Sequence, residues 1–172
     1  MTATKASVST YSTVTPSPIG ELQIVVDEHD RLVAIGLPGH HRAMPEAVAN
    51  ARRCAHVVVQ LREYFAGMRT KFELQIAAAG TDFQRRAWRS LQSIPFGSTA
   101  SYQEQATRAG NPRAVRAIGA ANGKNPVPIV VPCHRVIGKD GSLTGFGGGL
   151  ATKQWLLQHE ARVLAKGNLR RR

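Results

Sequence analysis

Two helix starts in the second half of the chain constrain its fold more than any other feature of the sequence. Thr81–Gln84 and Ser101–Glu104 each place a Ser or Thr three residues before a Glu or Gln, the pattern of a capping box. We expect the first helix to run to about Ser93, before Pro95, and the second to end near Ala109. The second half should therefore be mostly helical.

A third helix is expected directly after these two. Residues 110–111 turn the chain, and Pro112 occupies the place of a first helical residue. Two short helices joined by a tight turn predict a helix-turn-helix. The third helix, residues 113–121, is Ala, Gly and Arg apart from Val115 and Ile118, which can face the protein. Such a thin basic helix suits the DNA minor groove, about 6 Å wide. Close helix packing through the alanines is the alternative.

The first half of the chain reads as a small sheet with a helix. Residues 1–10 are expected to be disordered, and alternating apolar residues predict a hairpin from strands at 22–26 and 31–35. Helical spacing of apolar residues predicts a helix over 45–65, and a further strand is expected at 72–76. The chain is therefore expected to be an α+β protein.

Charge is distributed unequally along the 172 residues, whose net charge is +12. Residues 1–80 hold eight Lys or Arg and seven Asp or Glu, whereas residues 81–172 hold fifteen and four. The change coincides with a featureless connection at 77–80, where we place a domain boundary. The basic half suggests a polyanionic partner, most simply nucleic acid, with a generally basic surface as the alternative. The expected domains are residues 1–79 and 80–172, the second ending in a basic tail at 166–172.

The remaining composition excludes several classes of protein. The sequence has neither a secretory apolar segment nor a stretch able to span a bilayer, so we expect a cytoplasmic protein. Cys54 and Cys133 are then expected to be free thiols. Cys54 lies inside the expected helix at 45–65 and reads as a small buried hydrophobic residue. The histidines do not fall at zinc-ligand spacings with either cysteine, so we expect no metal and no cofactor.

Cys133 has neighbours that suit a nucleophile. The sequence Pro132-Cys133-His134-Arg135 follows an apolar run at 129–131, which we expect to be a short buried strand. A thiol attacks as thiolate, and a nearby imidazole or cation favours that form. A core cysteine beside an incidental histidine explains these residues about equally well.

The segment Asn125–Gly138, with its central Pro132-Cys133-His134-Arg135, resembles the active-site signature of the O6-alkylguanine-DNA alkyltransferases, the methylated-DNA–protein-cysteine methyltransferases. The resemblance covers essentially residues 80–164 and implies a small N-terminal antiparallel sheet with helices, followed by a helix-turn-helix domain similar to a winged helix. Further matching segments follow the family's order and spacing, at 80–84, 94–97, 101–102, 110–119, 145–149 and 153–160, with a weaker match at 17–22.

The resemblance implies single-turnover, direct-reversal DNA repair. An O6-alkylguanine, chiefly O6-methylguanine, would be flipped out of duplex DNA and its alkyl group transferred irreversibly to Cys133. His134 would take the thiol proton through a water molecule, and Glu160 would orient His134. Tyr102 would promote flipping and donate a proton to guanine N3, and Asn125 would brace the hinge beside the active-site loop.

The resemblance also assigns DNA and substrate contacts. Arg116 would enter the base stack as an arginine finger in place of the flipped base. The other expected DNA contacts are Ser101, Tyr102, Arg113, Ala114, Ala117 and Ala120. The expected pocket residues are Val136, Phe146, Gly147, Gly148 and Lys153, with Phe146 standing where the family often has tyrosine.

The expected partner is duplex DNA containing O6-alkylguanine, bound by a monomer without a membrane or an obligate protein partner. A DNA-binding protein without chemistry is the first alternative, but lesion sensors of that kind lack the acceptor cysteine. A thiol hydrolase is the second, and it leaves the charge asymmetry unexplained. The sequence leaves open the tolerance for bulky adducts, cooperative binding along DNA, and the reason for Gln105 at a usually apolar position.

Overall fold

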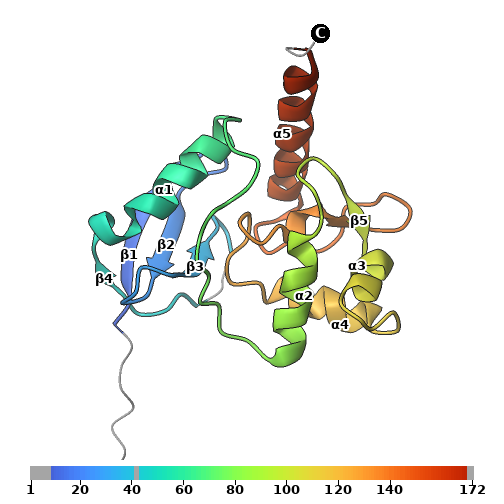
Figure 1. The fold of residues 1–172 in the computed structure, drawn as a ribbon, viewed down its shortest axis with the longest axis horizontal. Coiled ribbons are helices and arrows are strands. Elements are labelled where there is room, and N and C mark those ends of the chain that lie inside the picture. Colours follow the sequence, from blue (N-terminus) through green and yellow to red (C-terminus); the bar gives the residue numbers. More distant parts are fainter. Residues whose placement is uncertain (1–8, 41–42, 170–172) are drawn as a thin grey trace, which may run out of the picture.

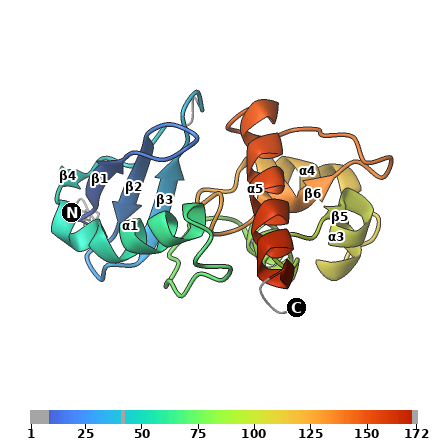
Figure 2. The ribbon, with the colours of Figure 1, turned by 90° about the horizontal axis from the view of Figure 1, so that it is seen from above.

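The computed structural model describes residues 9–40 and 43–169, and it places the two halves of the chain side by side (Figures 1 and 2). The first half is a sheet covered on one face by helix α1, and the second half is mainly helical. Of residues 1–10, which were expected to be disordered, residues 1–8 lie outside the described residues, as do the last three residues of the basic tail. Thr10 is ordered, contrary to that expectation, because its carbonyl accepts from the Val48 N–H.

The sheet contains the predicted hairpin and two further strands. Its strands are β1 (Tyr11–Thr15), β2 (Leu22–Val26), β3 (Leu32–Gly36) and β4 (Val48–Ala49), in the order β3-β2-β1-β4. Strands β1, β2 and β3 pair antiparallel, whereas β4 pairs parallel to β1. The α+β class is confirmed, and the last strand makes the sheet mixed.

Helix α1 (Ala51–Phe65) begins later than the predicted Pro45. Val48 is held in the sheet because its N–H bonds the Thr10 carbonyl at 2.9 Å. Asn50 then caps the helix, its side chain accepting from the Arg53 N–H at 3.3 Å. The face toward the sheet consists of Cys54, Val57, Leu61 and Tyr64, all buried.

The strand predicted at 72–76 does not form. Only Ile76 bridges to the sheet, opposite Leu32. The Leu32 N–H donates to the Gln75 carbonyl and the Leu32 carbonyl accepts from the Ala77 N–H, both at 2.8 Å. The segment therefore closes the edge of the sheet at one point instead of extending it.

The helices of the second half start where the capping boxes predict. Both boxes are complete, at Thr81 with Gln84 and at Ser101 with Glu104. The third helix starts at Val115 instead of Pro112, because a turn closed by the Ala114 N–H and the Asn111 carbonyl precedes it. The last helix ends at Leu169. The elements are α2 (Asp82–Gln92), β5 (Ala100–Ser101), α3 (Tyr102–Arg108), α4 (Val115–Gly123), β6 (Val136–Ile137) and α5 (Leu150–Leu169).

Gln105 has a clear structural role. It is fully buried, and its side-chain amide and that of Asn122 on α4 exchange hydrogen bonds of 2.9 and 2.7 Å. Its Nε2 also donates to the Ala87 carbonyl of α2 at 3.3 Å. A buried amide with all these partners costs little and fixes the relative positions of the three helices. An apolar residue would fill the space without fixing them.

One hydrophobic core joins the two halves. Leu22, Ile24 and Leu61 of the sheet and α1 belong to the same buried cluster as Leu91 of α2 and Leu156 of α5. The halves are therefore packed against each other through apolar side chains.

Candidate active site

The loop before Cys133 is a tight turn and not the predicted strand. Ile129 has φ of 75°, a left-handed conformation that is rare for a β-branched residue. The Asn125 side chain holds the turn, since its Oδ1 accepts from the Val127 N–H at 3.1 Å and its Nδ2 donates to the Val131 carbonyl at 2.8 Å. Strain kept in place by a buried amide is typical of functional sites.

Cys133 begins a short 3-10 turn, Cys133–Arg135, directly after this loop. Its side chain is almost completely buried, and Nδ2 of Asn125 lies 3.2 Å from Sγ. Burial raises the pKa of the Cys133 thiol, although the Asn125 amide and the charge of Lys153 oppose that shift. The resting group is therefore a thiol, and attack requires a base to remove its proton.

His134 is arranged to act as such a base. It is fully buried, and its Nε2 lies 2.8 Å from Oε1 of Glu160. Burial would raise the pKa of Glu160, but hydrogen bonds and charge from His134 and Arg135 hold it at about 2. Because an ionised carboxylate only accepts, the proton of the imidazole is assigned to Nε2. Burial also lowers the pKa of His134, so the ring is neutral and Nδ1 carries the free lone pair.

Nδ1 of His134 has no hydrogen-bond partner within the described residues although it is buried. A buried acceptor without a partner is costly. It is the atom through which the ring can receive a proton. Since Cys133 is the adjacent residue, the proton acceptor and the thiol belong to one turn of the chain.

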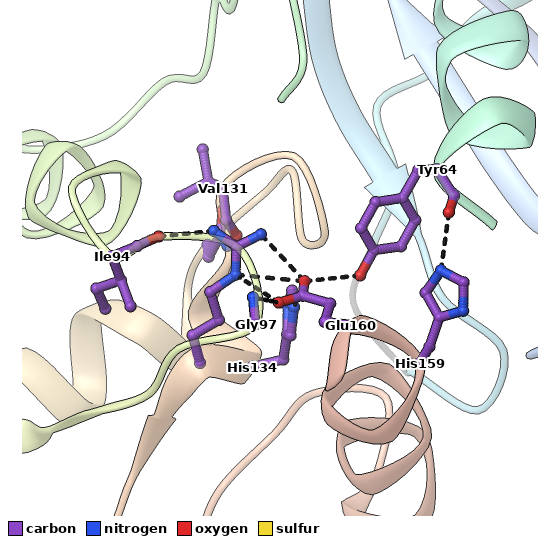
Figure 3. A network of polar contacts seen from close by, with 9 residues as sticks. Tyr64, Ile94, Gly97, Val131, His134, His159 and Glu160 are labelled. Carbon is purple, nitrogen blue, oxygen red and sulfur yellow. Dashed lines mark hydrogen bonds and ion pairs between the residues drawn. The ribbon is translucent and has the colours of Figure 1, made fainter. Parts of the chain in front are cut away.

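The Glu160 carboxylate is the centre of the polar network in Figure 3. Arg135 donates to both of its oxygens, with Nε 3.0 Å from Oε2 and Nη2 3.0 Å from Oε1. The Gly97 N–H donates to Oε2 at 2.8 Å, and the Tyr64 hydroxyl donates to Oε1 at 2.9 Å. Arg135 is itself anchored on the Ile94 carbonyl at 2.7 Å. The carboxylate is thus fixed from several directions, and His134 is fixed with it.

Lys153 is buried beside the segment that follows the cysteine. Its Nζ donates to the Val136 carbonyl at 2.5 Å and to the Thr144 carbonyl at 2.7 Å. Burial lowers the pKa of Lys153, while the nearby Cys133 opposes that shift. The lysine therefore holds the start and the end of the loop over 136–144 together and adds a positive charge near the thiol.

Tyr102 lies between the helix-turn-helix and the glycine-rich loop at 145–149. Its hydroxyl donates to the Thr144 carbonyl at 3.1 Å, the same carbonyl that Lys153 bonds. A Cβ on Gly119 would lie 3.8 Å from the Tyr102 ring, which is ordinary contact. The ring thus packs against helix α4 while its hydroxyl reaches the loop beside the cysteine.

A small cavity beside Cys133 is closed by the first half of the chain. Cys133, Asn125 and Gly147 line it together with His40, which follows β3. A Cβ on Gly147 would lie 2.4 Å from Nε2 of His40 and one on Gly148 would lie 2.8 Å from the Leu37 side chain, so a larger residue at either position would have to displace these side chains. The remaining lining residues are Leu37, Asn122, Gly123, Pro128 and Phe146.

Apart from Ser101 at the end of β5 and Tyr102 at the start of α3, the predicted DNA contacts lie on and before helix α4. Arg116, Ala117 and Ala120 are exposed on the helix, whereas Ile118 is buried. Arg113 and Ala114 precede the helix, the first exposed and the second half-buried. The exposed face therefore presents one cation among small side chains.

Three contributors were missed at the level of sequence. Arg135 carried a signal, because a cation next to His134 in an apolar stretch needs an anion when buried. Tyr64 and His40 carried no such signal, because Tyr64 fits the apolar stripe of α1 and His40 lies in a loop. The structure brings together Cys133, His134, Asn125, Glu160 and Lys153, and Tyr102 reaches the same loop.

The described part of the chain has neither a candidate metal site nor a helix able to cross a bilayer. Within residues 9–40 and 43–169, no group of three or more His, Cys, Asp or Glu side chains could hold a metal ion. In the same residues, every helix is too short or too polar to cross a bilayer.

Comparison with known proteins gives consistent matches over both halves. Residues 10–78 match the family described as 6-O-methylguanine DNA methyltransferase, ribonuclease-like domain, and residues 82–162 match its DNA binding domain. A methylated-DNA–protein-cysteine methyltransferase of Shigella flexneri is 42% identical over 160 residues, covering 86% of this chain and 94% of the relative. One of Mycolicibacterium paratuberculosis is 57% identical over 113 residues, covering 66% and 68%.

Two solved structures are similar to this chain. Mycobacterium tuberculosis OGT in complex with DNA has a TM-score of 0.84 and 40% identity, covering 89% of this chain and 94% of the other. The O6-methylguanine-DNA methyltransferase of Pyrococcus kodakaraensis, with a TM-score of 0.59 and 20% identity, covers 88% of this chain and 98% of the other and shares the fold.

Proposed function

The chain belongs to the 6-O-methylguanine DNA methyltransferase family, and from this membership we propose that it repairs DNA by moving the alkyl group of O6-alkylguanine onto its own Cys133. The observation that carries the proposal is the arrangement in which Asn125 holds Sγ beside His134 and Glu160 holds His134. The DNA-bound relative from Mycobacterium tuberculosis supports duplex DNA as the partner.

The chemical step forms a bond between Sγ of Cys133 and the alkyl carbon and breaks the bond from that carbon to O6. The thiol proton passes through a water molecule to Nδ1 of His134, the atom that has no protein partner among the described residues. The ionised Glu160 then stabilises the imidazolium that results. General-base help of this kind contributes about 10²- to 10⁴-fold.

The leaving guanine needs a proton because it departs as an anion. We assign this donation to the Tyr102 hydroxyl, directed to guanine N3, since the hydroxyl lies beside the loop that follows Cys133. The product thioether is a poor alkyl donor, so each molecule acts once. All of these groups come from one chain, which supports a monomer that works without a cofactor.

Access to the base requires flipping, which costs a few kcal/mol. Arg116 would fill the vacated place in the stack, while Ser101, Arg113 and the alanines of α4 approach the backbone. The exposed, small-residue face of α4 supports this docking. In the pocket, the carbonyls of Cys133 and Val136 would accept from the guanine amine, and the Gly147 N–H would donate to O6.

Intact mass spectrometry after incubation with duplex DNA containing one O6-methylguanine tests the chemistry. We expect one methyl group per chain, located on Cys133, and none on Cys133→Ala. Cys54→Ala is the matched control and should gain the methyl group as the unmodified protein does. A methyl group on Cys54, or several turnovers per chain, would overturn the mechanism. Binding to the lesion without any mass change would indicate a sensor instead.

The role of Arg116 is tested by comparing two substrates. Arg116→Ala should slow repair in duplex DNA roughly tenfold to a hundredfold, because stacking contributes about 1–3 kcal/mol per base. The defect should be much smaller with the free base O6-benzylguanine, which needs no flipping. Arg52→Ala, which removes an exposed arginine of α1, is the control and should affect neither substrate. Equal defects on both substrates would exclude the finger role.

A further inference from the structure

Tyr64 connects the first half of the chain to the proton-accepting pair. It lies on the buried face of α1, and its hydroxyl is 2.9 Å from Oε1 of Glu160. Nε2 of His134 is 2.8 Å from the same oxygen. Figure 3 shows the Tyr64 ring pointing directly at the carboxylate. Tyr64 and His134 therefore share one acceptor atom.

The direction of this hydrogen bond follows from the charge on the carboxylate. Because Glu160 has a pKa of about 2 and is ionised, it accepts and the Tyr64 hydroxyl donates. Burial, and then the charge of Glu160, raise the pKa of Tyr64 well above its ordinary value. The hydroxyl thus keeps its proton at every working pH.

Tyr64 is held in this position from both sides. Its own carbonyl is 2.8 Å from Nε2 of His159, the residue before Glu160 on α5. Its ring packs edge-on against the Phe96 ring, with the two ring centroids 5.9 Å apart, and its centroid lies 5.5 Å from that of the Phe72 ring. Two successive residues of α5 are therefore bound by one residue of α1, and the hydroxyl has little freedom to turn away.

We propose that Tyr64 is a positioning residue for alkyl transfer, whose hydroxyl sets the basicity of His134 through the shared Glu160 oxygen. The proposal rests on the proposed role of His134 as proton acceptor. The Tyr64 hydroxyl donates to Oε1 in addition to His134 and Arg135, and so withdraws negative charge that would otherwise stabilise the imidazolium of His134. The first half of the chain would then help to decide the pH at which Cys133 is activated.

Removing the hydroxyl should leave the carboxylate in place. Oε1 would still accept from His134 and from Nη2 of Arg135, and Oε2 from the Gly97 N–H. The change should therefore act on charge more than on geometry. The ionisable groups around the pair are Tyr64 of α1, Cys133 and Arg135 of the 3-10 turn, and Lys153 and His159 of α5.

The experiment compares Tyr64→Phe with the unmodified full-length protein. The rate of Cys133 modification is measured from pH 5 to 9, once with O6-benzylguanine and once with iodoacetamide. Without Tyr64, more negative charge faces His134, its pKa rises, and the neutral base is lost at higher pH. We expect the acid limb of both profiles to move upward by about one pH unit, because the Glu160 carboxylate loses a hydrogen bond and its charge then acts more strongly on His134.

Two controls make the outcome unambiguous. Tyr11→Phe, on β1 and stacked under Arg53, should leave both profiles unchanged. Replacing Tyr64 with 3-fluorotyrosine keeps the shape and gives a stronger donor, so the limb should move downward, and this arm also serves if Tyr64→Phe does not fold. A lower melting temperature with unmoved profiles would show that Tyr64 only packs and would overturn the proposal. Iodoacetamide needs no guanine recognition, so a failure of alkyl transfer from guanine would appear separately.

Discussion

The two buried cysteines have opposite hydrogen-bonding environments. Cys54 is fully buried, and its sulfur lies 3.6 Å from the Tyr11 carbonyl and 4.0 Å from the Ile24 carbonyl. These partners can only accept, so they stabilise the thiol. Cys133 is 8% exposed, and its sulfur instead accepts a hydrogen bond from the side-chain amide of Asn125. Burial raises the pKa of both thiols. The charge of Asp30 raises the pKa of Cys54 further, whereas the Asn125 side chain and the charge of Lys153 lower that of Cys133.

The wider surroundings reinforce this difference. Cys54 packs with the apolar stripe of α1 against the sheet. Cys133 is followed by His134 and Arg135, which share the buried carboxylate of Glu160, and it borders a small cavity. Cys133 therefore combines a buried charge network with an adjoining cavity, whereas Cys54 is fully buried in the apolar core.

Glu160→Gln should have the largest effect on Cys133, because it removes the charge that supports His134. We expect methyl transfer from duplex DNA to slow by about a hundredfold or more, in line with the loss of general-base help. Rapid-quench single-turnover kinetics would measure the rate, with circular dichroism as a check of folding. Glu63→Gln, which affects a half-buried carboxylate of α1 paired with Arg69, is the control. A rate within threefold of the unmodified protein, roughly 0.6 kcal/mol, would refute the role of Glu160.

Acid should weaken the Cys133 region through the same carboxylate. The pKa of Glu160 is held at about 2, below its ordinary value of 4.5, so folding favours the ionised form. This contribution, on the order of 3 kcal/mol, is complete above pH 4.5 and is lost as the pH falls toward 2. Urea unfolding between pH 7 and 3 should show a steeper loss in the unmodified protein than in Glu160→Gln. Parallel curves would contradict the assignment.

The sequence predicted those features of the two cysteine regions that depend on local spacing of residues. The apolar stripe around Cys54, the hairpin β2–β3 and both capping boxes follow from periodicity and from fixed spacings, and all are present. The predicted start of α1 at residue 45 was wrong, because Asn50 caps the helix and it begins at Ala51. Local rules located the elements but not every boundary.

The Cys133 region was predicted less completely because its geometry depends on long-range contacts. The run at 129–131 has strand composition, yet the Asn125 side chain folds it into a turn with Ile129 in a left-handed conformation. Tyr64 and Glu160 are far apart in sequence and meet only once α1 packs on α5. Family resemblance supplied the site residues, and chemistry at the level of single residues could not have chosen among them.

His40→Ala tests whether the cavity beside Cys133 limits the size of the alkyl group that reacts there. Nε2 of His40 lies against Gly147 at the wall of the Cys133 cavity, so its removal enlarges the space for an alkyl group. We expect the rate for O6-benzylguanine relative to O6-methylguanine to rise about tenfold. His29→Ala, at an exposed histidine beside Glu28, should leave the ratio unchanged. An unchanged ratio in His40→Ala would show that other residues limit adduct size.

Cys54→Ala should have the smallest effect and should act on stability alone. Removing a fully buried sulfur leaves a small void in the core, which costs about 1 kcal/mol. Chemical denaturation should record the loss, while the methyl-transfer rate stays unchanged. A slower transfer would mean that the Cys54 core supports Cys133 through α1, and the contact from Tyr64 to Glu160 is the route by which it would do so.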